Sequence, residues 1–151
     1  EKALPAIQAF GKLIKHVGES GAGFAVKAVN NMLLAVNLCS VAEGFTTLKV
    51  HGVNLHEALD CINASSGKSG VTEMVLPQRI LNRAFPLTFA LPLLAKDTGI
   101  ALDLVRDAKL SAPVIALTQS LIQAASNLAE KDSDFSSAVK MYESWNKITL
   151  E

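Results

Sequence analysis

A lysine and two asparagines stand in an otherwise apolar stretch, with a spacing suited to chemistry. Lys27 and Asn31 are four residues apart, so on a helix they project from one face, with Asn30 adjacent. The small residues 21–23 precede them and would let a ligand approach backbone N–H groups that attract anions. On spacing alone, an acid or base beside an anion site is one interpretation. A lysine that extends to solvent, with asparagines that bind neighbouring helices, is the other.

A second polar pair, Lys96-Asp97, lies in a segment with helical periodicity. Without further information these two residues fit an ordinary solvated helix face.

Other chemistries find no matching motif. Gly67-Lys68-Ser69 is not a phosphate loop, because Ile62 occupies the position of that loop's first glycine. No G-x-G-x-x-G dinucleotide fingerprint and no G-x-S-x-G nucleophile elbow occurs. The three histidines and two cysteines lack metal-ligand spacing, so we expect no metal site.

The element that must position Lys27 and Asn31 is a long helix from about Gly21 to Val50. Apolar residues cover nearly all its faces, which is typical of a helix buried all round. Its length of roughly 42 Å exceeds the diameter of about 38 Å of a compact globule of this size. We therefore predict that it extends into a partner chain, giving a homodimer or a dimer of dimers. Two shorter helices broken near Gly44 are the alternative.

Further helices follow with readable boundaries. Asn54 and Glu57 form a capping box for a helix to about Ala64. A loop at 65–70 and a short helix lead to a break at Phe85-Pro86. Helices are then predicted over Thr88–Lys109, from Pro113 to Ala129 with Ser111 as N-cap, and over Ser136–Trp145. The prediction is an all-α fold after residue 20.

The first 19 residues have a different character. Helix formers at 6–15 overlap a short apolar run, Leu13–Val17, that favours a strand ending at Gly18. A single strand has no partners for its backbone. The chain also begins at Glu1 rather than Met. We therefore interpret residues 1–19 as the tail of a preceding dinucleotide-binding domain and residues 20–151 as a helical substrate-binding and dimerisation domain.

Composition narrows the class of protein. Of 151 residues, 50% are hydrophobic but only 5% aromatic, which suits closely packed helices. Fourteen basic residues balance fourteen acidic ones, which argues against a nucleic-acid partner. No signal peptide or membrane-spanning run stands out. Cys39 and Cys61 fit reduced thiols, so we expect a cytoplasmic location.

The order of motifs resembles the β-hydroxyacid dehydrogenase family, which includes 3-hydroxyisobutyrate dehydrogenase and, more distantly, 6-phosphogluconate dehydrogenase. The motifs are His-Val-Gly, G-x-G-x-x-x-K-x-x-N-N, residues 62–68, 94–101 and Asp134-Phe135-Ser136, and they span essentially the whole chain. The resemblance implies the helical C-terminal domain of the 6-phosphogluconate dehydrogenase type, built around one long central helix and dimeric. The resemblance further implies that this helical domain follows the last helix and strand of a Rossmann domain, which binds NAD or NADP.

The resemblance also implies roles for individual residues. Lys27 matches the catalytic lysine, which assists proton transfer at the hydroxyl of a small β-hydroxy acid. Partial burial brings a lysine amine toward the pH range of acid–base work, so we expect Lys27 to be buried. Asn31 and Gly23 match substrate-binding positions, whereas Asn30 supports packing. Lys96 matches the lysine that reaches the cofactor, and Asp97 is expected to orient Lys96 or the local backbone.

Alternatives follow from the same residues. The loop Ser65–Gly70 lies where relatives shape the pocket for the acid, but Gly70-Val71-Thr72 stands where several have an aromatic residue. The identity of the acid is therefore open. A helical dimerisation module without chemistry is the second hypothesis. An imine or ketone reductase is the third, although the presence of Lys27 separates the chain from imine reductases.

Overall fold

The computed structural model describes residues 3–151 as an assembly of helices. The only pairing of extended backbone in that range is an isolated antiparallel bridge between Ala90 and Asp134. The predicted all-α class is therefore confirmed over the described residues. The elements are α1 (Leu4–Gln8), α2 (Ala22–Val50), α3 (Leu55–Asn63), η1 (Val71–Ile80), α4 (Leu91–Asp107), α5 (Pro113–Leu128), η2 (Phe135–Ala138) and α6 (Val139–Asn146).

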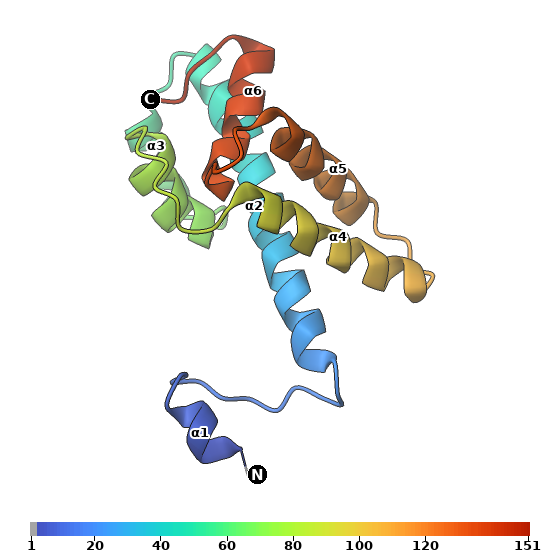
Figure 1. Ribbon diagram of the computed structural model, residues 1–151. Helices are drawn as coiled ribbons and strands as arrows, with labels where there is room; N and C mark the ends of the chain where they lie inside the picture. Colours follow the sequence, from blue (N-terminus) through green and yellow to red (C-terminus); the bar gives the residue numbers. More distant parts are fainter. Residues whose placement is uncertain (1–2) are drawn as a thin grey trace.

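The long helix α2 is continuous through Gly44 and forms the axis of the fold (Figure 1). Its 29 residues correspond to a length of about 44 Å. α4, α5, α6 and η1 all pack against it. The alternative of two shorter helices is therefore wrong.

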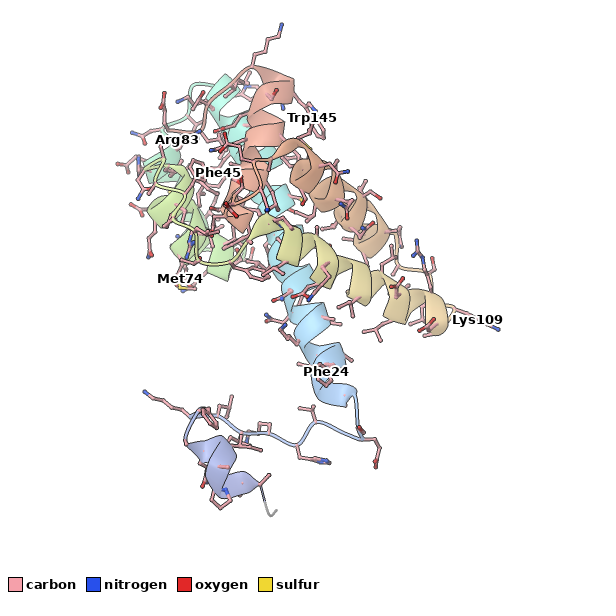
Figure 2. The ribbon with its side chains drawn as sticks, viewed as in Figure 1. Phe24, Phe45, Met74, Arg83, Lys109 and Trp145 are labelled. Atoms are coloured by element: carbon pink, nitrogen blue, oxygen red, sulfur yellow. The ribbon has the colours of Figure 1, made fainter. Side chains whose placement is uncertain are left out.

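Burial of α2 within one chain changes along the length of the helix. Its second half is largely enclosed, but its first turns project beyond the other helices, where Phe24 is 80% exposed (Figure 2). Within a single chain the helix is thus not buried all round. Cover of the first half by a partner chain, as predicted from the helix length, stays a prediction.

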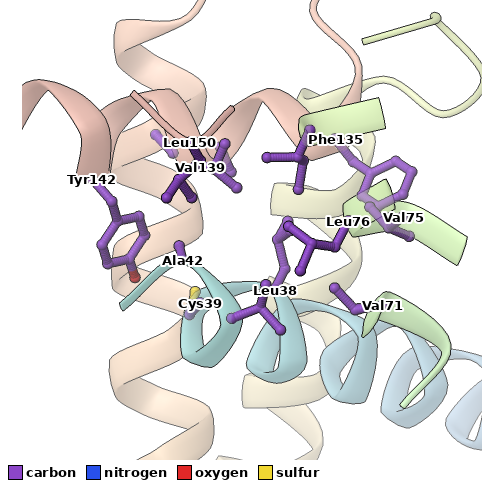
Figure 3. Close-up of a cluster of buried hydrophobic side chains, with 14 of the residues drawn as sticks. Leu38, Cys39, Ala42, Val71, Val75, Leu76, Phe135, Val139, Tyr142 and Leu150 are labelled. Carbon is purple, nitrogen blue, oxygen red and sulfur yellow. The ribbon is translucent and has the colours of Figure 1, made fainter. Parts of the chain in front are cut away.

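The main core lies around the second half of α2. Leu38, Ala42 and Phe45 meet side chains from η1, α4, η2 and α6, among them Leu76 and Val139, all at most 2% exposed (Figure 3). Burial of aliphatic side chains of this size contributes about 1.5–3 kcal/mol each. This core fixes the orientation of α2 and hence the direction in which its first half projects.

The helix α3 begins as predicted. The Asn54 side chain accepts hydrogen bonds from the backbone N–H groups of His56 and Glu57 at 3.0 and 3.3 Å. The helix ends at Asn63, as expected from the sequence.

The short helix after the loop, η1, is a π-helix rather than an α-helix. Pro77 lies inside it and has no N–H to donate to the carbonyl of Thr72, five residues earlier. That carbonyl instead accepts a hydrogen bond from Asn63 Nδ2 at 3.3 Å. The proline is thus tolerated because a neighbouring side chain satisfies the carbonyl.

Two predicted helix starts are wrong. α4 begins at Leu91 rather than Thr88, because the Asp134 carboxylate accepts hydrogen bonds from the N–H groups of Thr88 and Phe89 and holds them outside the helix. α5 is preceded by Ala112, without a side-chain cap, instead of by Ser111. Pro113 at its start has no N–H, so one of the donors that a cap would satisfy is missing.

The predicted strand Leu13–Val17 is not a strand in the structure. It is extended chain between α1 and α2, and it has no strand partner among residues 3–151. Leu13 and Val17 in this segment are 79% and 52% exposed, and Phe10 before it is 90% exposed. The first two residues of the predicted tail lie outside the described residues.

By length and composition alone, α2 is apolar enough to cross a membrane, with a mean hydropathy of 1.4 over its best 18-residue window. No membrane-spanning run was expected from the sequence, so by this criterion the expectation is wrong for α2. The same properties belong to a core helix, and α2 carries much of the core described above.

Candidate functional site

Lys27 and Asn31 share one face of α2 with Gly23, at intervals of four residues. This face is turned toward α4, where it meets the carboxylate of Asp97. Asn31 Nδ2 donates a hydrogen bond of 2.7 Å to Asp97 Oδ2, and Lys27 Nζ lies 3.6 Å from the same oxygen. Lys96 Nζ lies 3.5 Å from the other carboxylate oxygen. The structure therefore brings Lys27, Asn31 and Lys96 together at Asp97.

A small apolar cluster holds the two helices in this register. Ala28 and Met32, next to Lys27 and Asn31 in sequence, pack with Ala101 of α4, at exposures of 5% or less. Val36 and Ile115 lie against this cluster. The small side chains at positions 28 and 101 let the two backbones approach closely, which brings the polar side chains within reach of one another.

The Asp97 side chain is 7% exposed, and its environment sets its ionisation. Burial raises the pKa of the carboxyl. The hydrogen bond from Asn31 and the charges of Lys27 and Lys96 outweigh burial, so that the pKa of Asp97 lies below its usual range. Asp97 is thus an anion at neutral pH.

The lysines themselves are more open than expected. The Lys27 side chain is 68% exposed and that of Lys96 is 63% exposed. The expectation that Lys27 is buried is wrong for this chain alone, because the helices around α2 do not reach its first turns. Asn30 is also exposed and donates a 3.3 Å hydrogen bond to Asn31 Oδ1, so it does not pack between helices.

The start of α2 is open on the Lys27 side. Gly21 precedes the helix with a φ of 97°, a left-handed conformation that glycine adopts most readily, and no side chain caps the helix. A Cβ atom placed on Gly23 would meet nothing within 4 Å. The described residues therefore leave space at Gly23 beside the first N–H groups of the helix, where an anion is favoured.

The loop 65–70 does not join this site. It lies beside a groove of about 450 Å³ that the loop and the second half of α2 both line. Lys68 forms an ion pair of 2.6 Å with Glu73. Within one chain, the loop and Lys27 therefore belong to different regions.

Asp97 is the residue that sequence reasoning undervalued. The sequence predicts only an orienting role for Asp97, yet Asp97 is the common partner of Lys27, Asn31 and Lys96. A signal was present in the sequence. Leu94 and Ala101 lie three residues before and four after Asp97, so a charged residue occupies the apolar face of α4.

The helical arrangement of this chain has counterparts among known proteins. Residues 21–142 match the family model described as NAD-binding of NADP-dependent 3-hydroxyisobutyrate dehydrogenase. The chain belongs to this family, whose cofactor is NAD or NADP.

Particular relatives agree with the family assignment. The chain is 31% identical over 150 residues to 2-(hydroxymethyl)glutarate dehydrogenase of Eubacterium barkeri, covering 99% of the chain and 50% of that protein. It is 30% identical to the NAD-dependent L-serine dehydrogenase of Pseudomonas aeruginosa, covering 95% and 50%. The chain thus spans about half the length of the curated relatives it matches.

Solved structures show the same fold. The 3-hydroxyisobutyrate dehydrogenase of Mycobacterium tuberculosis, solved with L-serine, superposes with a TM-score of 0.84 at 27% identity, covering 93% of this chain and 50% of that one. The enzyme of the same name from Salmonella typhimurium gives a TM-score of 0.82 at 21% identity, covering 93% and 49%. The predicted helical C-terminal domain is therefore confirmed.

Proposed function

We propose that this chain is the substrate-binding and catalytic half of an NAD(P)-dependent oxidoreductase that oxidises a small β-hydroxy acid or reduces the matching semialdehyde. The observation that carries the proposal is the contact of Lys27 and Asn31 with Asp97, beside an open helix start at Gly23. It supplies a proton carrier, a hydrogen-bonding amide and room for an anionic group within one short stretch of α2.

Lys27 is the proposed acid and base. Its amine would take the proton of the substrate hydroxyl during oxidation and return it to the carbonyl oxygen during reduction. Asn31, held by Asp97, would keep the substrate beside the amine. The open backbone at Gly23 and the positive end of α2 suit the carboxylate of the acid.

The residues present also fit the dinucleotide. Lys96 is largely exposed, lies on the same side as Lys27, and is free to turn its ammonium group to an anionic or polar part of the cofactor. When bound, the dinucleotide would supply the hydride acceptor or donor. Lys27 would contribute protonation, Asn31 orientation of the substrate and Lys96 binding of the cofactor.

Two further parts complete the proposal. Residues 1–19 would lead from a dinucleotide-binding domain in the same polypeptide, which would cover Phe10, Leu13 and the open side of Lys27. A second copy of the chain would cover the opposite face of α2. There Val26, Val29 and Leu33 form an exposed apolar stripe at intervals of three and four residues, away from Lys27 and Asn31.

The experiment is an assay of the complete polypeptide with NAD⁺ and NADP⁺ against a panel of small β-hydroxy acids that includes 3-hydroxyisobutyrate and L-serine. We expect reduced dinucleotide to form with at least one acid, and none to form with the 151-residue chain alone. Turnover by the isolated chain, or tight dinucleotide binding to it, would contradict the division of labour proposed here.

The two rival hypotheses give different results in the same assay. If the chain is a dimerisation module without chemistry, Lys27→Met should leave any turnover of the complete polypeptide intact. An imine reductase predicts activity on cyclic imines and indifference to 3-hydroxy acids. A cytoplasmic location stays a prediction that rests on Cys39 and Cys61, neither of which forms a disulfide in the described chain.

A further inference from the structure

Asp97 lies between the cofactor side of the proposed site, at Lys96, and the reaction side, at Lys27 and Asn31. One carboxylate oxygen contacts Asn31 and Lys27, at 2.7 and 3.6 Å, and the other contacts Lys96 at 3.5 Å. Asp97 is nearly buried, at 7% exposed, whereas the two lysine side chains are more than 60% exposed. The Asp97 carboxylate is therefore fixed by the packing of the helices, whereas the two lysine side chains can move.

The charges in this cluster do not balance. Two ammonium groups share one carboxylate, which leaves a net positive charge at the open end of the site. An anionic group of a ligand can supply the missing negative charge, whether it is a phosphate of the dinucleotide or the carboxylate of an acid. A lysine that turns toward such an anion leaves the Asp97 carboxylate to the other lysine.

Because the Asp97 carboxylate is buried, its contacts with the two lysines affect its free energy. Asp97 lies on the apolar face of α4, where an unpaired carboxylate is costly. Lys27 and Lys96 are the two charged groups that stabilise its anion. When one of them is drawn away, the carboxylate retains the other more firmly, because the second lysine and Asn31 are then its remaining partners among the described residues.

We propose that Asp97 is a positioning residue that couples the cofactor end of the site, at Lys96, to the reaction end, at Lys27 and Asn31. The inference rests on the proposed function and adds to it a coupling between cofactor binding and the position of Lys27. Binding of a dinucleotide at Lys96 holds Lys27 more firmly against Asp97, in the place where it transfers a proton. The hydrogen bond from Asn31 keeps the Asp97 carboxylate in place while the two lysines change their contacts with it.

The sharing itself is tested on the 151-residue chain, without any ligand. ¹³C NMR of the Asp97 carboxyl group follows its titration in the wild type and in Lys27→Met and Lys96→Met. Each substitution is expected to raise the pKa of Asp97 by about half a unit to one unit, and both together by more. Lys131→Met, at an exposed loop position, serves as the control and leaves it unchanged. If either site variant matches Lys131→Met, Asp97 is not shared and the coupling is refuted.

The coupling is tested on the complete polypeptide with NAD(P)⁺ and its acid substrate. Lys96→Met is expected to raise the KM for the dinucleotide and also to lower kcat severalfold. In an Asp97→Asn background, which nearly keeps the volume of the side chain, Lys96→Met is expected to change the KM alone. An equal loss of kcat in both backgrounds would overturn the proposal.

A merely structural role of Asp97 gives a different pattern. It predicts that Asp97→Asn lowers the melting temperature and the active fraction but leaves kcat and KM per active site unchanged, and that result would also overturn the proposal. If the wild type shows no dinucleotide-dependent turnover, the proposed function fails. The NMR titration then still decides whether Asp97 is shared.

Discussion

The amide of Asn31 donates a 2.7 Å hydrogen bond to the carboxylate of Asp97, across 66 positions of sequence. This bond joins the first half of α2 to α4 at the point where both helices carry residues of the site. Because Asp97 also lies within 3.6 Å of Lys27, the bond fixes the relative positions of the proposed acid–base group and the proposed substrate-binding amide.

Replacing Asn31 with alanine is expected to weaken substrate binding, and it also removes one hydrogen-bond partner of the buried Asp97 carboxylate. A hydrogen bond to a charged group is worth about 1.5–3 kcal/mol, so we expect the KM for the acid to rise about 10- to 100-fold. Steady-state kinetics of the complete polypeptide measure this change. Asn127→Ala, on the exposed end of α5, is the matched control. An unchanged KM would remove Asn31 from the substrate site.

Asp134 is expected to be the most costly polar side chain to remove. It is 2% exposed and accepts hydrogen bonds from Arg79, Thr88, Phe89 and Ser136, which join η1, the segment before α4 and η2. Asp134→Ala would leave these donors without their acceptor, at a cost of about 3 kcal/mol in the free energy of unfolding. Urea denaturation of the variant measures the loss. Asp132→Ala, two residues away and exposed, should change stability little.

Acid should weaken the fold partly through the same side chain. Burial raises the pKa of Asp134, but the hydrogen bonds from Ser136, Thr88 and Phe89 outweigh it and hold the pKa below its usual range. A carboxyl with a lowered pKa in the folded state stabilises it above the unfolded pKa of about 3.9. That contribution disappears as the pH falls through the folded pKa.

We therefore expect the free energy of unfolding of the wild type to fall between about pH 5 and pH 2. The fall should be smaller in Asp134→Asn, whatever the absolute stability of that variant. Asp132→Asn should follow the wild type. Parallel pH dependences of the wild type and Asp134→Asn would show that the Asp134 carboxylate is not stabilised by folding.

The exposed stripe on α2 predicts the state of association. Light scattering of the chain should give about twice the mass of one chain, or four times if dimers pair. Leu33→Glu places a charge in the middle of the stripe and should shift the protein to monomers without loss of helical circular dichroism, because Leu33 is 57% exposed in one chain. Trp145→Glu, in the last helix α6 and away from the stripe, should leave the mass unchanged. A monomeric wild type would contradict the dimer.

The helices, and the face of α2 that Lys27 and Asn31 share, could be predicted because their signals are local. Lys27 and Asn31 share a face by spacing alone, Asn54 caps its helix, and the apolar run to Val50 marks one continuous element. These features depend on residues within a few positions of one another.

The features that could not be predicted depend on distant partners. Thr88 is held outside α4 by Asp134, 46 positions later, and Pro77 is accommodated in a π-helix by a side chain from α3. Leu13–Val17 has the composition of a strand, but a strand needs a neighbour. The meeting of Lys27, Asn31 and Lys96 at Asp97 likewise depends on how α2 crosses α4, and helical periodicity alone does not specify that crossing.

The most direct test is the kcat/KM of Lys27→Met in the complete polypeptide, with its dinucleotide and acid substrate, beside Lys131→Met as control. Methionine keeps the apolar stem of the side chain but cannot carry a proton. We predict a loss of about 10²- to 10⁴-fold with unchanged helical content, and no loss in the control. Turnover of Lys27→Met within a factor of two of the wild type would contradict the account, because α2 would then carry no acid–base group.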